Sequence, residues 1–537
     1  MIAAERTAPS VSRRLAALDP PLRYRSVRLV LAGLPVEDEE RARALARVLV
    51  CTGTGHLAVC TGLALLTRLG EPQDVPYLRT LGLLRTLARP VIHALDAIDR
   101  PAAAELELRG HEGAPVFRPL LAAVASGDRG AVRECLVALP GDLAPEAARR
   151  VAEAARLAEL MAAADGPVAA DGADAGLVAC AGRLLFRMTG QRDYRPEILS
   201  YRDTPYAYEA FARGASLLAP TLDHQALLLS ALQELRTGPA MLHDWGPGRW
   251  EAALAELTAV LERPEWRALP AYEGEETGVR RRLAWMRRTR AQVLRAPYEP
   301  APTAVPSGPP AATASSSPSG FSRLAIEICE RDPDDPDTIE ARVLVDGLPV
   351  VPAYFGRGPA DSPERLLDTG ALWATGEPRE VRLAEAYCTE GCCGALYVTV
   401  RRDGDQVVWS GWRSPVPPGG KRELPELRFE AAAYDAEVAR ARDDGSWMWP
   451  ARRTARLIAA GLRERPDLLA RWHVRFGWAT TTFREVDETL ISLMYDAEDG
   501  SVRQLLWRVP EDGTPPEDRA AAALRRPLTE DPRGYGR

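Results

Sequence analysis

The stretch PYEPAPTAVPSGPPAATASSSPSG, Pro297–Gly320, divides this chain into two parts. Proline, alanine, serine and glycine dominate it, and no periodic apolar pattern continues through it. A segment of this composition buries too little apolar surface to offset the entropy lost on ordering. We therefore predict a flexible linker at 297–320, with a folded part on each side.

The whole chain has the composition of a globular protein. Its 537 residues are too many for one ordinary core, and its hydrophobic content of 46% and charged content of 27% are typical of soluble domains. A net charge of −7 argues against general nucleic-acid binding. Lys421 is the only lysine, and the heavy use of arginine, alanine, glycine and proline is typical of a GC-rich bacterium. No signal-peptide pattern is visible, so we expect a cytoplasmic protein with reduced cysteines.

The part before the linker has the apolar spacing of helices. APEAARRVAEAARLAELMAAA, which begins at Ala144, repeats apolar residues at intervals of three and four. A weaker break, AAADGPVAADGADAG, occupies 162–176. We predict an α-helical region at 1–161 and its helical continuation at 177–296.

One helical segment resembles a HEAT-type repeat. It is LALLTRLGEPQDVPYLRTLGLLRTLARPVIHALDAI, Leu63–Ile98, and a looser copy is VFRPLLAAVASGDRGAVRECLVAL, Val116–Leu139. Corresponding positions, Val75 and Val116, are about 41 residues apart, within the usual HEAT period of roughly 40–47. The resemblance implies stacked helical pairs with an exposed groove, which is a common surface for protein partners.

The part after the linker has strand patterns. RLAIEICE alternates apolar and polar residues, and IEARVLVDGLPVV predicts a hairpin that turns at Asp346-Gly347. PARRTARLIAAGLRERPDLLARW, 450–472, predicts a helix with proline in its first turn, and TLISLMYDA and SVRQLLWRV predict two last strands. We predict an α+β, mainly antiparallel domain at 321–510 and a loose tail at 511–537. The expected fold class is multidomain, with an all-α, HEAT-like N-terminal region and this α+β C-terminal domain.

A cysteine cluster is the most specific chemical feature. Three of the eight cysteines lie in YCTEGCCG, Tyr387–Gly394, between two predicted strands. Zinc in structural sites takes four thiolate or imidazole ligands. Cys388, Cys392 and Cys393 supply three, and Cys329 or His473 would supply the fourth. However, the C-x3-C-C spacing is not that of a zinc knuckle, and adjacent side chains diverge in a strand. A zinc site, a reversible thiol switch and a structural turn therefore stay open.

Two other segments are candidate partner-binding surfaces because they combine aromatic residues with arginine. They are YRDTPYAYEAFARG, 201–214, and RRRLAWMRRTR, 280–290. The alternative is that the first opens a helix with part-buried tyrosines and the second complements a helix dipole. The candidate partner-binding residues are Tyr201, Arg202, Asp203, Tyr206, Tyr208, Arg280, Arg281, Arg282, Arg287 and Arg288.

Two further patterns are interpreted structurally. Val48–Leu66 carries no formal charge, but its hydrophobicity is moderate, so we expect a buried helix and no membrane span. Cys51–Ala58 contains G-x-G-x-x-A, the core of a dinucleotide-binding fingerprint, but a helix is predicted before it, where that fingerprint needs a strand. We predict no cofactor from these segments.

The function expected from the sequence is a binding or adaptor protein whose helical region docks a protein partner. A thiol- or zinc-dependent sensor or enzyme centred on the α+β domain is one alternative, and an inhibitor or immunity-type protein is another. The chain contains no G-x-S-x-G, H-E-x-x-H or P-loop motif, so no catalytic residue is assigned and an enzyme is less favoured.

Overall fold

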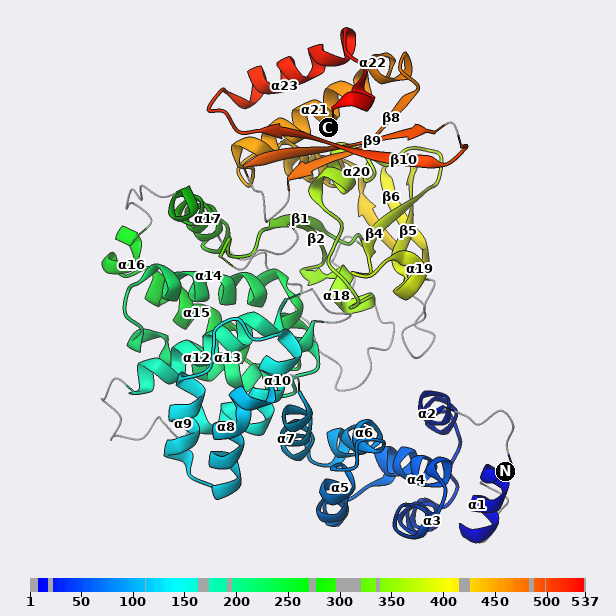
Figure 1. Ribbon diagram of the computed structural model, residues 1–537. Coiled ribbons are helices and arrows are strands. Elements are labelled where there is room, and N and C mark those ends of the chain that lie inside the picture. The colour runs from blue at the N-terminus through cyan, green and yellow to red at the C-terminus, as the bar shows by residue number, and fades with distance from the viewer. Residues whose placement is uncertain are drawn as a thin grey trace. The chain divides into compact units, whose positions relative to one another are not determined.

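The chain forms two compact units. The computed structural model, shown in Figure 1, describes residues 8–17, 23–111, 113–162, 173–190, 196–269, 277–295, 320–334, 339–414, 425–481, 487–497 and 499–535. The first unit, called the helical unit, comprises Met1–Met188 and Ser200–Ala219. The second, called the mixed unit, comprises Thr189–Leu199 and Pro220–Arg537.

Helices make up the regular structure of the described residues of the helical unit, as predicted. They are α1 (Ala8–Ala16), α2 (Tyr24–Ala32), α3 (Glu39–Thr52), α4 (His56–Leu69), η2 (Pro72–Asp74), α5 (Val75–Leu81), α6 (Ala88–Ile98), α7 (Arg100–Gly110), α8 (Ala114–Ser126), α9 (Arg129–Val137), α10 (Pro145–Ala154), α11 (Leu157–Ala162), α12 (Ala173–Met188), α13 (Thr204–Gly214) and η5 (Ala215–Leu217). Neighbouring helices pack in pairs, among them α3 with α4, α5 with α6 and α8 with α9.

Aspartates start three of these helices. Asp38, Asp99 and Asp128 each accept a hydrogen bond from a main-chain N–H of the first turn, at 2.9, 3.2 and 3.1 Å. Each cap satisfies a donor that has no partner within the helix and contributes about 1 kcal/mol. The starts of α3, α7 and α9 are thus determined locally.

A cluster of charges joins α6 and α7 to α10. Arg150, whose side chain is 5% exposed, donates to Asp96 at 2.6 Å and to Glu153 at 3.0 Å, and it pairs with Glu107. Burial raises the pKa of Glu107 to about 7 even though the Arg150 charge lowers it. Glu107 therefore keeps its proton to a higher pH than an exposed glutamate does.

The mixed unit combines helices with ten strands in its described residues. Its helical elements are η4 (Glu197–Leu199), α14 (Leu222–Thr237), η6 (Pro239–Leu242), α15 (Arg249–Leu261), α16 (Pro264–Ala268), α17 (Thr277–Val293), α18 (Val350–Tyr354), η8 (Glu364–Asp368), α19 (Glu390–Cys393), α20 (Ala431–Asp443), α21 (Pro450–Glu464), α22 (Asp467–Ala470), α23 (Pro516–Arg525), η9 (Arg526–Leu528) and η10 (Pro532–Gly534). Its strands are β1 (Leu324–Cys329), β2 (Glu340–Val345), β3 (Leu348–Pro349), β4 (Arg379–Glu385), β5 (Ala395–Asp403), β6 (Gln406–Arg413), β7 (Leu427–Glu430), β8 (Val474–Thr481), β9 (Glu488–Asp496) and β10 (Val502–Pro510).

These strands form three antiparallel sheets, with the orders β1-β2-β3, β4-β5-β6-β7 and β10-β9-β8. The core of the first two sheets includes Trp409, whose ring lies 5.4 Å from that of Phe429 and 6.2 Å from that of Tyr434. A second core lies between the third sheet and α21 and α23. The predicted α+β, mainly antiparallel architecture is confirmed.

Local turn signals are confirmed as well. Asp346 and Gly347 connect β2 to β3 with φ of 51° and 83°, the left-handed pair that a two-residue hairpin favours. α21 begins at Pro450 as predicted but ends at Glu464, because Pro466 cannot continue a helix. The prediction of one helix through Trp472 was therefore too long.

α14 and α17 belong to the mixed unit, although the sequence grouped 177–296 with the helical region. Arg342 on β2 donates to Glu234 of α14 at 2.8 Å. Arg282 on α17 donates to Asp332, just after β1, at 2.8 Å. These partners are 108 and 50 residues apart, so no local pattern predicts that they meet.

Residues 512–535 are folded, and α23 among them packs onto α21, which differs from the predicted loose tail. Ala520 and Ala523 of α23 are buried in the second core, and a Cβ on Gly461 would lie 2.4 Å from Leu524. The Tyr535 ring lies 4.6 Å from that of Trp507 on β10. The polar, proline-rich composition of this segment suggested a tail, whereas Pro516 occupies the first turn of a helix, a position that suits proline.

The remaining sequence predictions have mixed outcomes. The linker, 297–320, lies outside the described residues except for Gly320. The HEAT-like segments form α4–α6 and α8–α9, but their membership of that repeat class stays a prediction. Val48–Leu66 is divided between α3 and α4, and no described helix is long and apolar enough to cross a membrane. Cys51–Ala58 begins in the last turn of α3 and ends in the first turn of α4, so a helix stands where the dinucleotide fingerprint needs a strand.

Candidate thiol site

The cysteine cluster lies on a closed turn between β4 and β5. The main-chain N–H of Ala386 donates to the carbonyl of Gly394 at 3.0 Å, which ties the two ends of the turn together. Within it, the N–H groups of Cys392 and Cys393 both donate to the carbonyl of Thr389 at 3.1 Å, forming the single turn of α19. The sequence predicted a connection between strands here, and the helical turn inside it was missed.

The geometry of this turn brings three sulfur atoms together. The Sγ atoms of Cys388, Cys392 and Cys393 all lie within 4.8 Å of one another. The Cys393 thiol donates to the Cys392 sulfur at 3.7 Å. Cys392 is exposed and the other two are partly exposed, so solvent reaches all three thiols.

Gly394 makes the turn possible. Its φ of 95° and ψ of −177° lie in a region that glycine occupies and other residues almost never do. Hydrogen bonds to Glu385 on β4 and from Tyr397 on β5 also stabilise the turn. The Glu390 N–H donates to the Glu385 carboxylate at 2.9 Å, and the Tyr397 hydroxyl donates to the Glu390 carboxylate at 2.6 Å. The backbone that presents the thiols is therefore held at both ends and at its centre.

The pKa values of Cys388 and Cys393 move in opposite directions. Desolvation opposes a lower pKa for Cys388, but hydrogen bonds from Cys393, the main chain and Cys392 outweigh it and lower that pKa. The hydrogen bond to Cys388 raises the pKa of Cys393 to about 11. Cys388 thus ionises before Cys393, and the thiolate is the form that binds metals and reacts.

Neither predicted fourth ligand joins the cluster. Cys329 lies on β1, is 2% exposed, and its Sγ is 3.7 Å from the Thr237 hydroxyl. Burial raises the pKa of Cys329 to about 12, so it stays a neutral thiol. Among the residues that the structure describes, the metal-binding groups that converge here are the three cysteines alone, without His473.

The predicted partner-binding residues at the start of α13 separate into core and surface. Tyr201 and Tyr208 are buried, with exposed fractions of 0% and 1%. Arg202, Asp203 and Tyr206 are exposed. Of these five residues, only the three exposed ones could contact a partner. The burial of Tyr201 and Tyr208 agrees with the alternative that tyrosines at this helix start pack inside.

The arginines of α17 are largely engaged within the mixed unit. Arg282 is paired with Asp332, and Arg288 donates to Glu330 at 2.5 Å. Arg281 lies over the Trp449 ring, 4.3 Å from its centre. Arg280 and Arg287 are exposed. These contacts hold α17 against the end of β1 and the start of α21.

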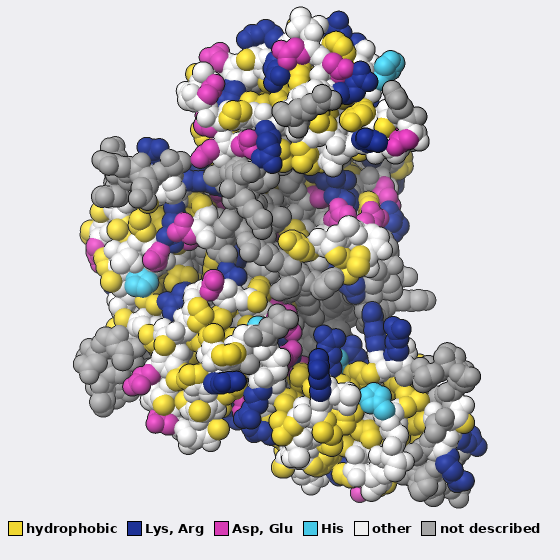
Figure 2. All heavy atoms as spheres, viewed as in Figure 1, with side chains coloured by type: hydrophobic (Ala, Val, Ile, Leu, Met, Phe, Trp, Pro, Cys, Tyr) yellow, Lys and Arg dark blue, Asp and Glu magenta, His cyan; other side chains and the backbone are white. Residues whose placement is uncertain are grey.

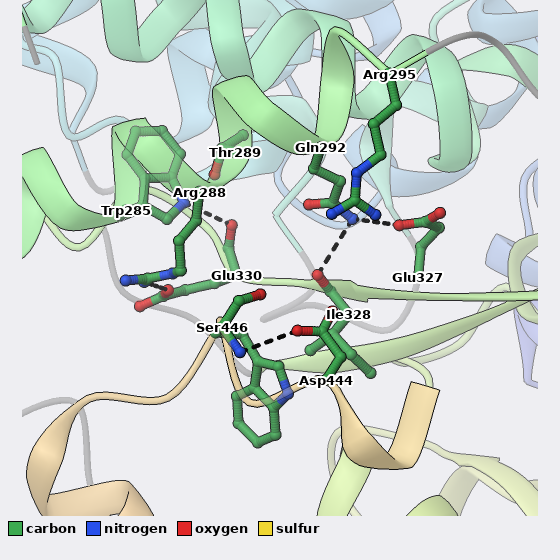
Figure 3. A pocket seen from close by; sticks show the side chains of 11 residues that line it. Trp285, Arg288, Thr289, Gln292, Arg295, Glu327, Ile328, Glu330, Asp444 and Ser446 are labelled. Carbon is green, nitrogen blue, oxygen red and sulfur yellow. Dashed lines mark hydrogen bonds and ion pairs between the residues drawn. The ribbon is translucent and has the colours of Figure 1, made fainter. Parts of the chain in front are cut away.

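A small polar cavity was not predicted. It has a volume of about 30 Å³, room for about one or two water molecules, and lies among α17, β1 and the loop before α21. Figure 3 shows Arg288 pointing to Glu330 and Gln292 pointing to Glu327, whose carboxylate it reaches at 2.7 Å. Glu327 and Glu330 appear in the sequence only as polar members of an alternating strand. The cavity is too small for an organic substrate.

Comparison of the chain with protein-family models, with curated proteins and with solved structures gave no match. The functional argument therefore rests on the side chains described above.

Proposed function

We propose that this protein binds a thiophilic metal ion, zinc in the first instance, through the thiolates of Cys388, Cys392 and Cys393. The observation that carries this proposal is the convergence of their three Sγ atoms within 4.8 Å. Thiolate donors favour zinc and monovalent copper over magnesium or calcium. Calcium and magnesium take oxygen ligands instead.

The distance between the sulfur atoms suits the binding of one ion that all three share. With zinc–sulfur bonds of about 2.3 Å and tetrahedral angles, two sulfurs on one zinc lie about 3.8 Å apart. The Cys392 and Cys393 sulfurs are 3.7 Å apart. Small side-chain rotations would bring Cys388 to the same spacing, because the turn that holds the three residues is already closed.

Three protein ligands leave one coordination position for water or another ligand. Structural zinc sites use four protein ligands, whereas sites with three keep a position open for exchange or chemistry. The turn also lies at the edge of a core built from apolar side chains, with Cys388 and Cys393 packed against it. We therefore expect the protein to fold without the metal and to bind the ion reversibly, as a sensor or carrier of metal does.

The experiment is a competitive titration of the reduced full-length chain. Zinc would be added against a chromophoric chelator, and monovalent copper against its own chromophoric ligand. We expect one ion per chain. Cys388→Ser, Cys392→Ser and Cys393→Ser should each weaken binding by more than the roughly 10–100-fold typical of outer-shell changes.

Cys51→Ser is the matched control, because Cys51 is exposed but lies on α3, in the helical unit. It should leave the affinity unchanged. Absence of stoichiometric binding of either ion would refute the metal proposal. If mass spectrometry then found a disulfide within the turn after mild oxidation, the cluster would be a thiol switch instead.

A second candidate function is partner docking by the helical unit. Leu29 and Val30 on α2 are 62% and 65% exposed, and Leu83 and Leu84 between α5 and α6 are 67% and 53% exposed. Figure 2 shows hydrophobic side chains over much of the visible face of the N-terminal helices. Contiguous exposed apolar patches mark interaction sites, and the docking candidate requires that these side chains belong to one.

The docking candidate predicts that a partner purified with the full chain is lost from Leu83→Asp and Leu84→Asp variants that remain folded. A partner retained by both variants would remove this surface from consideration. An inhibitor or immunity-type role would appear in the same experiment as a partner whose activity falls on binding.

A further inference from the structure

The cysteine turn lies at the end of a hairpin that holds the two ends of the turn together. β4 and β5 are antiparallel, and Glu385 faces Ala395 at the last position of their register. The hydrogen bond from Ala386 to Gly394 closes the next position. The cysteine side chains can therefore rearrange within a short loop while the two strands stay paired.

The backbone limits which of the three cysteines can form a disulfide with each other. Disulfides join residues whose Cα atoms are about 4.4–6.8 Å apart, whereas the Cα atoms of adjacent residues are about 3.8 Å apart. A bond between Cys392 and Cys393 is therefore disfavoured. An unstrained disulfide within the turn must include Cys388, whose Sγ lies within 4.8 Å of the other two sulfurs.

Burial favours Cys393 as the partner of Cys388. Both side chains are partly buried and pack against the core of the first two sheets, whereas Cys392 is exposed. Cys388 and Cys393 therefore share the core-facing side of the turn. Their Sγ atoms, which lie within 4.8 Å of each other, need only side-chain rotations to reach the disulfide bond length of about 2.05 Å.

We propose that a hydroperoxide converts Cys388 and Cys393 into a disulfide and thereby releases the metal ion, so that oxidation controls the occupancy of the site. This inference rests on the proposed function, because it assigns a means of regulation to the same thiolates. Solvent reaches these thiols, as a reaction with a dissolved oxidant requires.

With hydrogen peroxide as the oxidant, the reaction balances in two steps. The sulfur of one cysteine attacks a peroxide oxygen, the O–O bond breaks, and a sulfenic acid and one water molecule form. The sulfur of the other cysteine then attacks the sulfenic sulfur, the S–O bond breaks, the S–S bond forms and a second water molecule leaves. The two sulfurs lose two electrons in total and the peroxide accepts them. When the thiolates start bound to the metal, the two protons that complete the water molecules come from solvent.

Disulfide formation and metal binding exclude each other at this site. The thiolate is the form of cysteine that binds a metal ion, and a disulfide between Cys388 and Cys393 removes two of the three thiolates. Zinc sites use three or four protein ligands, so Cys392 by itself does not retain the ion. A dithiol reductant restores both thiols by exchange and with them the site.

The test adds hydrogen peroxide to the reduced, zinc-loaded full-length chain in the presence of a chromophoric zinc chelator. We expect the chain to release its bound zinc and to bind zinc again after treatment with a dithiol. Alkylation of the remaining thiols and cleavage after arginine would locate the bond, because residues 383–401 form one peptide that holds all three cysteines. Alkylated cysteines in this peptide should fall from three to one, and fragment ions should place the remaining label on Cys392.

Two variants separate oxidation from metal binding. Cys392→Ser keeps both partners of the disulfide, so peroxide should still form that bond although the variant binds zinc weakly. Cys388→Ser leaves only the adjacent pair of cysteines in the turn, so it should form no disulfide there. Cys51→Ser changes an exposed cysteine on α3 and should behave as the parent chain does in both measurements.

The outcomes distinguish this inference from the proposed function. A reduced chain that binds no stoichiometric zinc would refute the metal site and, with it, the controlled release. A chain that binds zinc when reduced and keeps the ion after peroxide treatment would overturn this inference and leave the metal site standing. A disulfide in Cys388→Ser, a disulfide between two chains, or a remaining label on Cys393 in place of Cys392 would each overturn the assigned pair.

Discussion

Replacing Gly394 by alanine tests whether the closed turn positions the thiols. At φ 95° and ψ −177°, a residue with a Cβ is strained by an amount on the order of 1–3 kcal/mol. The protein can keep the turn and lose that stability, or relax the turn and move Cys393 away from Cys388. Gly394→Ala would cause either result while all three cysteine ligands remain in the chain.

The magnitude follows from the strain. If the turn relaxes and the metal must restore it, the strain is subtracted from the binding free energy. Each 1.4 kcal/mol is a factor of ten, so the zinc affinity of Gly394→Ala should fall by about 5- to 150-fold. If the turn persists, the free energy of unfolding should fall by about 1–3 kcal/mol instead.

Gly391→Ala is the matched control in the same turn. A Cβ at Gly391 meets nothing within 4 Å, and its φ is not in the left-handed region. Alanine is favoured over glycine within a helix by about 0.5–1 kcal/mol, so this variant should bind zinc as the parent does and be no less stable.

The assays are the competitive zinc titration described above and denaturant unfolding of the metal-free protein. The reasoning is refuted if Gly394→Ala matches the parent in both zinc affinity and stability. It is also refuted if Gly391→Ala loses as much affinity as Gly394→Ala, since the effect would then not come from the left-handed conformation.

Two further predictions concern charges. Because burial raises the pKa of Glu107 to about 7, the folded state binds more protons than the unfolded state between the ordinary glutamate pKa and that value, and stability should fall as pH rises through this range. The loss in free energy of unfolding between about pH 5 and about pH 8 should be about 1–2 kcal/mol smaller in Glu107→Gln than in the parent protein, whereas exposed Glu134→Gln should lose as much as the parent. Equal pH profiles for the two variants would contradict this. Arg282→Ala should lower the free energy of unfolding by about 2–4 kcal/mol, because it leaves the buried carboxylate of Asp332 without its cation. Exposed Arg263→Ala should change it by less than about 0.5 kcal/mol in the same denaturant titration, and a similar loss in both variants would show that the Asp332 pair is not responsible.

Features that depend on neighbouring residues were predictable. The turn at Asp346-Gly347 follows from the left-handed backbone that these residues tolerate, and the start of α21 follows from Pro450 at its first turn. The all-helical character of one part and the strand alternation of the other follow from apolar spacing. These features need no knowledge of distant parts of the chain.

Features that depend on residues far apart along the chain could not be predicted from the sequence. The apolar stripe of α23 needs the facing surface of α21 before it can be recognised as packed, and Arg282 needs Asp332, 50 residues away, before it can be recognised as an internal ion pair. The composition of each segment alone therefore suggested a loose tail after 511. It also suggested that more arginines of α17 face solvent than the structure shows.

The candidate metal site shows the same division. The sequence by itself determined which cysteines are close along the chain and that they lie between two strands. Only the tertiary structure decided that their sulfurs meet, because the pairing of β4 with β5 closes the turn and Gly394 allows its geometry. It also decided that Cys329 is not a ligand, since β1 directs that thiol toward Thr237 in a buried position. Spacing along a chain limits which groups can meet, but the packing of strands and helices decides which of them do.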